Sequence, residues 1–253
     1  MNPIAGSGSA FPTISKNRET LALSDISFNV DTGEFIAIVG PSGCGKSTLL
    51  SLLCGLNMPE AGAIFWMGNF WKKIPKMPPG SAICSRRTTF LNGRDIFSNV
   101  SLGLEIQKLN TETKQELSDL LSDYGLAGLN TKASALSGGM RQRAALIRTL
   151  ALKPDLLLLD EHFLPLIIRQ GLWYVMNQLY FKEKWKDCYF SDPRPVRSYQ
   201  FADRIIVLTP RPGRIRTVLY LSFPDDCNSP LKRRNCPEFS HYFNTLWKEL
   251  IKD

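Results

Sequence analysis

Short runs of apolar residues, separated by polar turns, predict the strands of an α/β fold. Residues 35–39 and 156–159 are continuous apolar runs, which are typical of strands buried on both faces of a parallel sheet. Residues 23–30 alternate between apolar and polar positions, and this period of two predicts a half-buried strand. Further strands are expected over residues 187–191, 204–209 and 215–219, with a hairpin over 62–71.

Helical spacing dominates the middle and the end of the chain. Residues 48–56 are rich in leucine and predict a helix, and residues 98–109 and 113–124 also have helical spacing. Further helices are expected over residues 140–152, 164–180 and 238–251. The polar residues 225–237 are expected to form a loop. The helical stretch at about 85–150 lies between strand-rich segments, so we expect it to be a lobe inserted into an α/β core.

Nine consecutive residues fit the pattern G-x-x-x-x-G-K-[ST] of a phosphate-binding loop. They are Gly40, Pro41, Ser42, Gly43, Cys44, Gly45, Lys46, Ser47 and Thr48. The loop lies between a predicted strand and a predicted helix, a setting in which backbone N–H groups and the helix dipole bind phosphate. Lys46 is expected to reach the β- and γ-phosphates, and the Ser47 hydroxyl is expected to bind Mg²⁺. The sequence therefore predicts a nucleotide site.

Two acidic residues, Asp160 and Glu161, directly follow the predicted buried strand at 156–159. Ligands of open α/β sheets bind at the carboxyl ends of the strands, so these acids stand at the ligand edge. Asp160 is expected to bind Mg²⁺, directly or through water, and Glu161 to polarise an attacking water. The alternative is two solvated acids in a turn.

A second possible anion site begins at Ser137, a good N-cap for the helix that follows. The N–H groups of Gly138 and Gly139, together with the serine hydroxyl, could bind an anion there, although a plain helix cap explains the same residues. Near the start of the chain, Phe11 is an aromatic residue that could stack on a nucleotide base or simply pack.

Composition narrows the class of protein. The 253 residues are 43% hydrophobic and 21% charged, as in an ordinary globular protein. The net charge of +8 is spread along the chain without a basic block, so it gives mild support for a membrane surface and no nucleic-acid partner is expected. Six cysteines without C-x-x-C spacing and only two histidines predict neither a zinc site nor a disulfide framework, and a reducing cytosol is the simplest compartment.

The ordered motifs resemble those of the ATP-binding subunits of ABC transporters over nearly the whole chain. The phosphate loop at 40–48, the Leu-Ser-Gly-Gly signature at 136–142 and the strand with two acids at 156–161 have that family's order and spacing. Residues 40–46 and 202–214 are similar to the importer branch for nitrate, sulfonate, taurine and related solutes. The resemblance implies a P-loop NTPase (RecA-like) core with a parallel sheet, an antiparallel β subdomain and an inserted helical lobe.

The resemblance also implies the organisation of the chain and its assembly. One ABC ATPase domain would span residues 1–253, with its core at about 11–84 and 151–220, the helical lobe at about 85–150 and a C-terminal extension at about 221–253. A head-to-tail dimer would close on two ATP molecules, each between one subunit's phosphate loop and the other subunit's signature.

The implied partners follow from that assembly. They are integral membrane permease subunits, a second ATPase subunit and, indirectly, a periplasmic or lipoprotein solute-binding protein. A hetero-dimer is favoured and a homo-dimer is possible. The chain would be a peripheral protein on the cytoplasmic face of the inner membrane.

Three positions depart from the family pattern. Arg86 or Arg87 stands where a glutamine normally senses Mg²⁺ and the membrane subunit. Residues 162–167 lack the aspartate of the family's Leu-Asp ending, and Ser191 stands where the family has a histidine that contacts the γ-phosphate. Because all three changes concern one site, the chain's own site is expected to hydrolyse ATP poorly.

The sequence therefore favours an ABC-type ATPase subunit of an importer for a small organic or inorganic anion. The alternative is an ATP-dependent regulatory or binding module that is not coupled to a transporter. The similarity at 202–214 favours the importer, and the altered glutamine position favours the module.

Overall fold

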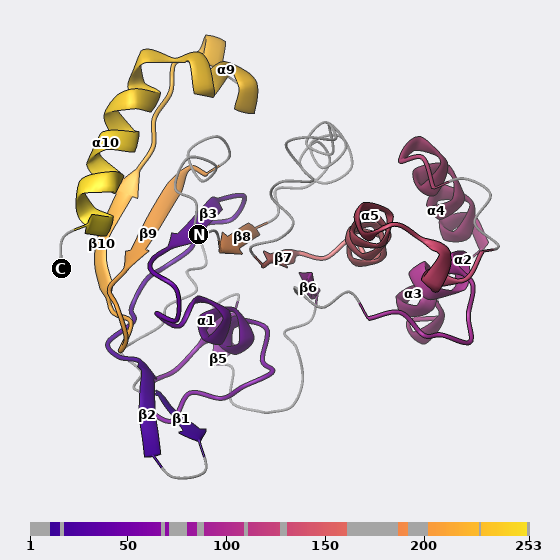
Figure 1. The fold of residues 1–253 in the computed structure, drawn as a ribbon, viewed down its shortest axis with the longest axis horizontal. Coiled ribbons are helices and arrows are strands. Elements are labelled where there is room, and N and C mark those ends of the chain that lie inside the picture. Colours follow the sequence, from indigo (N-terminus) through magenta and orange to yellow (C-terminus); the bar gives the residue numbers. More distant parts are fainter. Residues whose placement is uncertain are drawn as a thin grey trace.

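The computed structural model of the chain shows an α/β fold around one central sheet (Figure 1). The structure describes residues 11–15, 18–66, 69–70, 80–84, 89–108, 111–126, 131–160, 187–191, 202–227 and 229–251. Within these ranges no helix has both the length and the apolar character needed to cross a membrane. The helix expected over residues 164–180 lies outside the described residues.

The central sheet has six strands in the order β10–β9–β3–β8–β7–β6 (Figure 1). The strands are β3 (Phe35–Val39), β6 (Ser81–Cys84), β7 (Leu156–Leu159), β8 (Asp187–Ser191), β9 (Arg204–Leu208) and β10 (Ile215–Tyr220). Neighbouring strands are parallel except at one edge, where β10 runs antiparallel to β9. The predicted parallel sheet is therefore confirmed, and β6 is an addition that the sequence analysis did not identify.

Both faces of this sheet are covered, which explains why its central strands read as continuous apolar runs. In β3, Ile36 and Ile38 belong to a core that also contains the buried leucines of α1 (Lys46–Leu53). Phe35, Ala37 and Val39 belong to the opposite core, to which α5 (Gly138–Leu150) contributes. Alternate side chains of one strand thus enter different cores, and a polar residue would be buried on either side.

Two antiparallel hairpins lie outside the central sheet (Figure 1). They are β1 (Phe11–Ser15) with β2 (Arg18–Leu23), and β4 (Phe65–Trp66) with β5 (Asn69–Phe70). The second hairpin confirms the expectation for residues 62–71. The strand expected over residues 23–30 is wrong, because β2 ends at Leu23 and Asp25 has a φ of 52° that breaks the extended backbone. Ile26 and Val30 lie in an irregular segment and are buried, which explains why apolar and polar residues alternate in this part of the sequence.

The stretch between β6 and β7 is helical, as expected. It contains α2 (Ile96–Val100), α3 (Leu102–Ile106), α4 (Thr111–Asp123), a short 3-10 turn (Ala133–Ala135) and α5. In Figure 1, α2, α3 and α4 gather on the side of α5 that faces away from the sheet. The single helix expected over residues 98–109 is two helices that meet at Ser101. The first begins early because Asp95 is its N-cap and accepts a hydrogen bond from Ser98 N at 2.7 Å.

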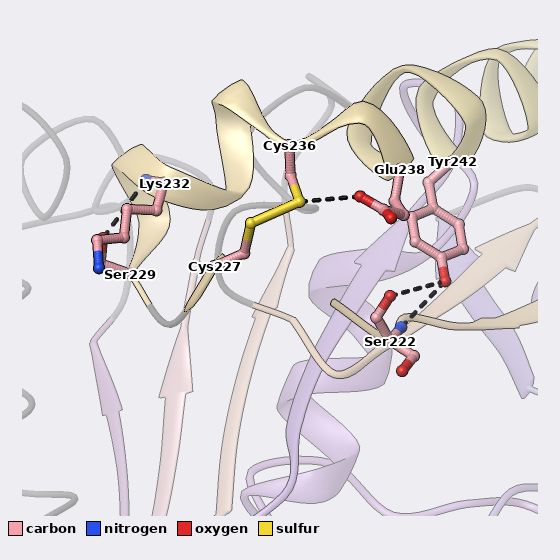
Figure 2. The surroundings of a disulfide bond; sticks show 7 residues. All are labelled: Ser222, Cys227, Ser229, Lys232, Cys236, Glu238 and Tyr242. Atoms are coloured by element: carbon pink, nitrogen blue, oxygen red, sulfur yellow. Dashed lines mark hydrogen bonds between the residues drawn. A yellow bond between two sulfur atoms is a disulfide. The ribbon is translucent and has the colours of Figure 1, made fainter. Parts of the chain in front are cut away.

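The end of the chain departs from the sequence expectation in one segment and agrees in another. The predicted final helix is present as α10 (Pro237–Ile251), which lies beside β9 and β10 in Figure 1. The loop expected over residues 225–237 is wrong for most of that stretch, because a 3-10 turn (Asp225–Cys227) and α9 (Pro230–Asn235) form there. Ser229 caps α9 by accepting a hydrogen bond from Lys232 N at 3.4 Å (Figure 2), and proline stands at the start of the helix.

A disulfide bond joins Cys227 to Cys236 across α9 (Figure 2). This corrects the expectation that the cysteines form no disulfide, which rested on the absence of C-x-x-C spacing. The two residues are nine positions apart, and the turn of α9 between them brings them together. Glu238 Oε2 lies 2.9 Å from Cys236 Sγ, and the Tyr242 hydroxyl accepts a hydrogen bond from Ser222 N at 3.1 Å (Figure 2). These contacts connect α10 with the segment that follows β10.

Candidate functional site

The loop between β3 and α1 curls into a cradle, and two glycines permit its shape. Gly43 has a φ of 79° and Gly45 a φ of 107°, both in the left-handed region that favours glycine. A Cβ at Gly45 would lie 2.6 Å from Leu23 Cδ2, so the loop also lies directly against the end of β2. The first N–H groups of α1 have no acceptor within the helix, which is the condition for binding an anion there.

Lys46 is the first residue of α1, and its side chain folds back over the loop. Lys46 is only 4% exposed, and Nζ donates hydrogen bonds to the carbonyl oxygens of Gly40 at 2.9 Å and Pro41 at 3.1 Å. Burying an ammonium group is costly unless it is paired, so these bonds fix a positive charge inside the cradle. An ammonium group combined with a helix N-terminus suits a polyphosphate.

The nine predicted loop residues differ in exposure along the cradle. Pro41, Ser42, Gly43 and Ser47 are exposed, which leaves the outer side of the loop open to a ligand. Cys44 is 1% exposed and belongs to the core beneath the loop. Its thiol therefore fills a packing position.

Asp160 follows β7 at the carboxyl edge of the sheet. Its N–H donates to the Cys84 carbonyl at 3.1 Å, which joins the ends of β7 and β6, and its side chain is half-buried. Only β8 separates β7 from β3, the strand that leads into the cradle. The structure thus brings Asp160 and Ser47 to the same edge of the sheet.

The side-chain oxygens at this edge suit Mg²⁺ better than they suit a metal ion whose ligands all come from the protein. No group of three His, Cys, Asp or Glu side chains that could hold a metal occurs in the described part of the chain. Mg²⁺ usually binds through one or two protein oxygens, with waters and substrate phosphates completing its octahedron. A hydroxyl from Ser47 and a carboxylate from Asp160 match that requirement.

Other residues predicted for the site have little or no described structure. Glu161, Arg86, Arg87 and residues 162–167 lie outside the described ranges. Phe11 is the first residue of β1, and only its backbone is described. Ser191 is the last residue of β8 and pairs with Ile38, one residue before the end of β3. The backbone register therefore places position 191 beside the strand that enters the cradle.

Ser137 and the two glycines after it form the exposed N-terminus of α5. The Ser137 hydroxyl accepts a hydrogen bond from Met140 N at 3.3 Å, which confirms the predicted N-cap. A Cβ added at Gly138 or Gly139 would meet no described atom within 4 Å. Nothing described within this chain therefore occupies the space beside the two glycines, and a ligand or another subunit could approach their N–H groups.

The C-terminal half of α5 is mostly buried, and it contacts the segment that follows β6. Arg148 Nη1 donates to the Thr89 carbonyl at 2.8 Å, and its guanidinium carbon lies 5.2 Å from the centroid of the Phe90 ring. The sequence analysis missed Arg148, because its role depends on a contact 59 residues away.

Burial, with a smaller effect of the Asp160 carboxylate, raises the pKa of the Cys84 thiol at the end of β6 to about 12, so this thiol stays protonated at neutral pH.

Comparison with known proteins gives these elements a family context. The sequence pattern of the ABC transporter family matches residues 23–163. An uncharacterised ABC transporter ATP-binding protein of Bacillus subtilis is 35% identical, over 92% of this chain and 89% of that protein. A taurine import ATP-binding protein of Yersinia pestis is 32% identical, over 80% of this chain and 79% of that protein. A nitrate import ATP-binding protein of Synechococcus elongatus is 32% identical over 91% of this chain, which covers 35% of that longer protein.

A solved structure agrees with the fold. A bacterial ABC transporter cassette solved as a dimer superimposes with a TM-score of 0.74 at 22% identity, covering 87% of this chain and all of that chain. The match confirms the expected P-loop NTPase architecture. Together with the family pattern and the relatives, it shows that the chain belongs to the ABC transporter family as one of its ATP-binding cassettes, which are ATPases.

Proposed function

We propose that the chain is the ATP-binding and ATP-hydrolysing subunit of an importer for a small organic or inorganic anion of the nitrate, sulfonate or taurine kind. The observation that carries the proposal is the cradle itself, in which the buried Lys46 ammonium and the N-terminus of α1 face an open loop. The solute class rests on similarity, because relatives over most of the chain are nitrate and taurine import proteins.

Each site residue that the sequence predicts within this chain has a role in this proposal. Lys46 and the loop N–H groups bind the β- and γ-phosphates of ATP, and Ser47 and Asp160 would hold Mg²⁺. Bound Mg²⁺ neutralises the charge that develops on the phosphates. Glu161 polarises the attacking water, and Phe11 stacks on the base.

The exposed N-terminus of α5 supports the assembly that we propose. Ser137, Gly138 and Gly139 contact the ATP bound by the opposite cassette in a head-to-tail dimer, which closes on two ATP molecules. Closure drives permease subunits in the membrane, and a solute-binding protein delivers the anion. The chain is a peripheral protein on the cytoplasmic face of the inner membrane in this proposal.

The chain's own catalytic site is impaired in this proposal. Ser191 is shorter than the histidine of the family pattern and carries no positive charge toward the γ-phosphate. Losing one electrostatic donor of this kind typically lowers turnover by about 10²–10³-fold. Glu161→Gln in this chain should leave most ATPase activity of a hetero-dimer intact, because the partner's site remains complete. Robust activity of this chain alone, lost on Glu161→Gln, would contradict the impairment.

A second candidate function is an ATP-dependent regulatory module without a transporter. The altered glutamine position at Arg86 or Arg87 favours it, because in the family that position faces the membrane subunit. Co-expression with a candidate permease subunit separates the two functions. The importer predicts that the chain moves to the membrane fraction only when the permease is present, and copurifies with it. A chain that stays in the soluble fraction in both cases would favour the module.

A further inference from the structure

The tight turn between β9 and β10 lies directly against the phosphate loop. Within the turn, Thr209 N donates to the Arg214 carbonyl at 2.9 Å, and Thr209 Oγ1 accepts from Arg214 N, also at 2.9 Å. These bonds close the turn around Gly213. The sequence analysis used this stretch only for its resemblance to importers and assigned its residues no role in the site.

Gly213 is bound to the end of β2 through its backbone. Gly213 N donates to the Ala22 carbonyl at 2.9 Å, and Ser24 N donates to the Gly213 carbonyl at 3.0 Å. A Cβ at Gly213 would lie 3.1 Å from Leu23 Cδ2, and a Cβ at Gly45 would approach the same atom. The turn, the end of β2 and the phosphate loop therefore meet around the fully buried Leu23 side chain.

The closest approach is between Gly213 and the loop backbone. A Cβ at Gly213 would overlap the carbonyl oxygen of Cys44, which belongs to the main chain and cannot move as a side chain would. The φ of Gly213 is outside the left-handed region, so its backbone conformation alone does not require glycine. Glycine is required at position 213 because the Cys44 peptide occupies the space.

We propose that Gly213 is a positioning residue for phosphate binding, because it provides the surface on which the Cys44–Gly45 peptide lies. The carbonyl of Cys44 and the N–H of Gly45 belong to one planar peptide unit, so moving the oxygen also rotates the N–H. That N–H is one of the loop donors that phosphate binding needs. The inference rests on the proposed function only in that the ligand of the loop is ATP.

Gly213→Ala is the direct test, and Gly93→Ala is its matched control. A Cβ at Gly93 would meet no described atom within 4 Å, and Gly93 lies outside the site. We expect Gly213→Ala to raise the Kd for Mg²⁺–ATP, measured by calorimetry, by about tenfold or more, the effect of losing one hydrogen bond to a charged group. Gly93→Ala should bind ATP as the wild type does.

A nucleotide-free readout separates a local displacement of the loop from a general loss of stability. Cys44 and Cys54 are both buried thiols outside the disulfide, Cys44 in the loop and Cys54 at the end of α1. We expect Gly213→Ala to speed alkylation of Cys44, located by peptide mass spectrometry, while Cys54 keeps its wild-type rate. Equal acceleration at both cysteines would mean general unfolding and would overturn the positioning role.

A milder variant keeps the proposal testable if Gly213→Ala does not fold. Thr209→Val removes the side-chain acceptor for Arg214 N without adding bulk beneath the loop. It should weaken ATP binding by about threefold, a smaller effect than losing a whole loop donor, and it should speed only Cys44 alkylation. Unchanged Cys44 alkylation in a folded variant would refute the inference. If the wild type does not bind ATP but the variant still speeds alkylation of Cys44, the result would support the positioning role of Gly213 and refute ATP as the ligand.

Discussion

Replacing Ser137 by aspartate distinguishes its role as the N-cap of α5 from its proposed role in contacting ATP. Within the chain, the Ser137 hydroxyl caps α5 by accepting from Met140 N at 3.3 Å. Aspartate caps helices about as well as serine and its charge favours a helix N-terminus, so Ser137→Asp should unfold at the wild-type denaturant concentration or above it. Ser137→Ala, which loses the cap, should cost about 1 kcal/mol of unfolding free energy.

In the proposed dimer, the same aspartate would face the γ-phosphate bound by the opposite cassette. Two like charges about 4 Å apart near a protein surface repel by about 4 kcal/mol. Because the N-terminus of α5 is exposed, solvent and salt reduce this value, and we expect a loss of ATP turnover of at least about tenfold. The assay is steady-state phosphate release by the complete complex in low and high salt.

Gly138→Ala provides an independent check on the same surface. A Cβ at Gly138 meets no described atom within 4 Å, and alanine is the better helix former by about 1 kcal/mol, so the variant should be at least as stable as the wild type. Its methyl group nevertheless enters the space through which the nucleotide would approach. Full turnover in both Ser137→Asp and Gly138→Ala would show that this helix end does not contact nucleotide.

Three further predictions concern other parts of the chain. Arg204→Met should lower the unfolding free energy by about 1.5–3 kcal/mol in denaturant titration, because it leaves the half-buried Glu34 carboxylate without the guanidinium that lies 2.7 Å away; a loss below about 1 kcal/mol would contradict this. Hydrogen bonds from Ser98 lower the pKa of Asp95, so its stabilisation is present above the ordinary carboxyl pKa and is lost as pH falls through the lowered value. Asp95→Asn should keep the cap and flatten this pH dependence of stability. Reducing the Cys227–Cys236 disulfide should lower the unfolding free energy by about 2.7 kcal/mol, because the cross-link no longer restricts the entropy of this short loop in the unfolded chain. An unchanged thermal midpoint after reduction would contradict this prediction.

The sequence predicted local structure best where that structure depends on neighbouring residues. The phosphate loop needs a strand, glycines and a helix start in immediate succession, and residues 35–53 supply all three locally. The same holds for the cap at Ser137, whose hydrogen-bond partner is three residues away. Continuous apolar runs also identified β3 and β7 correctly, because both faces of the sheet are covered.

The sequence did not predict the local structure where that structure depends on contacts between residues far apart in the chain. Residues 23–30 alternate between apolar and polar positions, yet no strand continues beyond Leu23, because Ser24 bonds to Gly213 and Asp25 turns the chain. The pairing of Cys227 with Cys236 required α9, a short helix whose cap and proline were present in the sequence but lay in a polar stretch. The contact of Gly213 with Cys44 joins positions 169 residues apart, and local patterns do not contain such information.

The most direct test of the account is the affinity of the purified chain for Mg²⁺–ATP, compared with that of Lys46→Ala. Lys46 should make charge-assisted hydrogen bonds to phosphate, each contributing about 1.5–3 kcal/mol. Lys153→Ala is a suitable control, because Lys153 lies at the surface and its side chain is 66% exposed. We predict that the wild type and Lys153→Ala bind ATP equally by calorimetry, and that Lys46→Ala binds at least about tenfold more weakly. Equal affinity for the wild type and Lys46→Ala would contradict the assignment of the cradle as the ATP site.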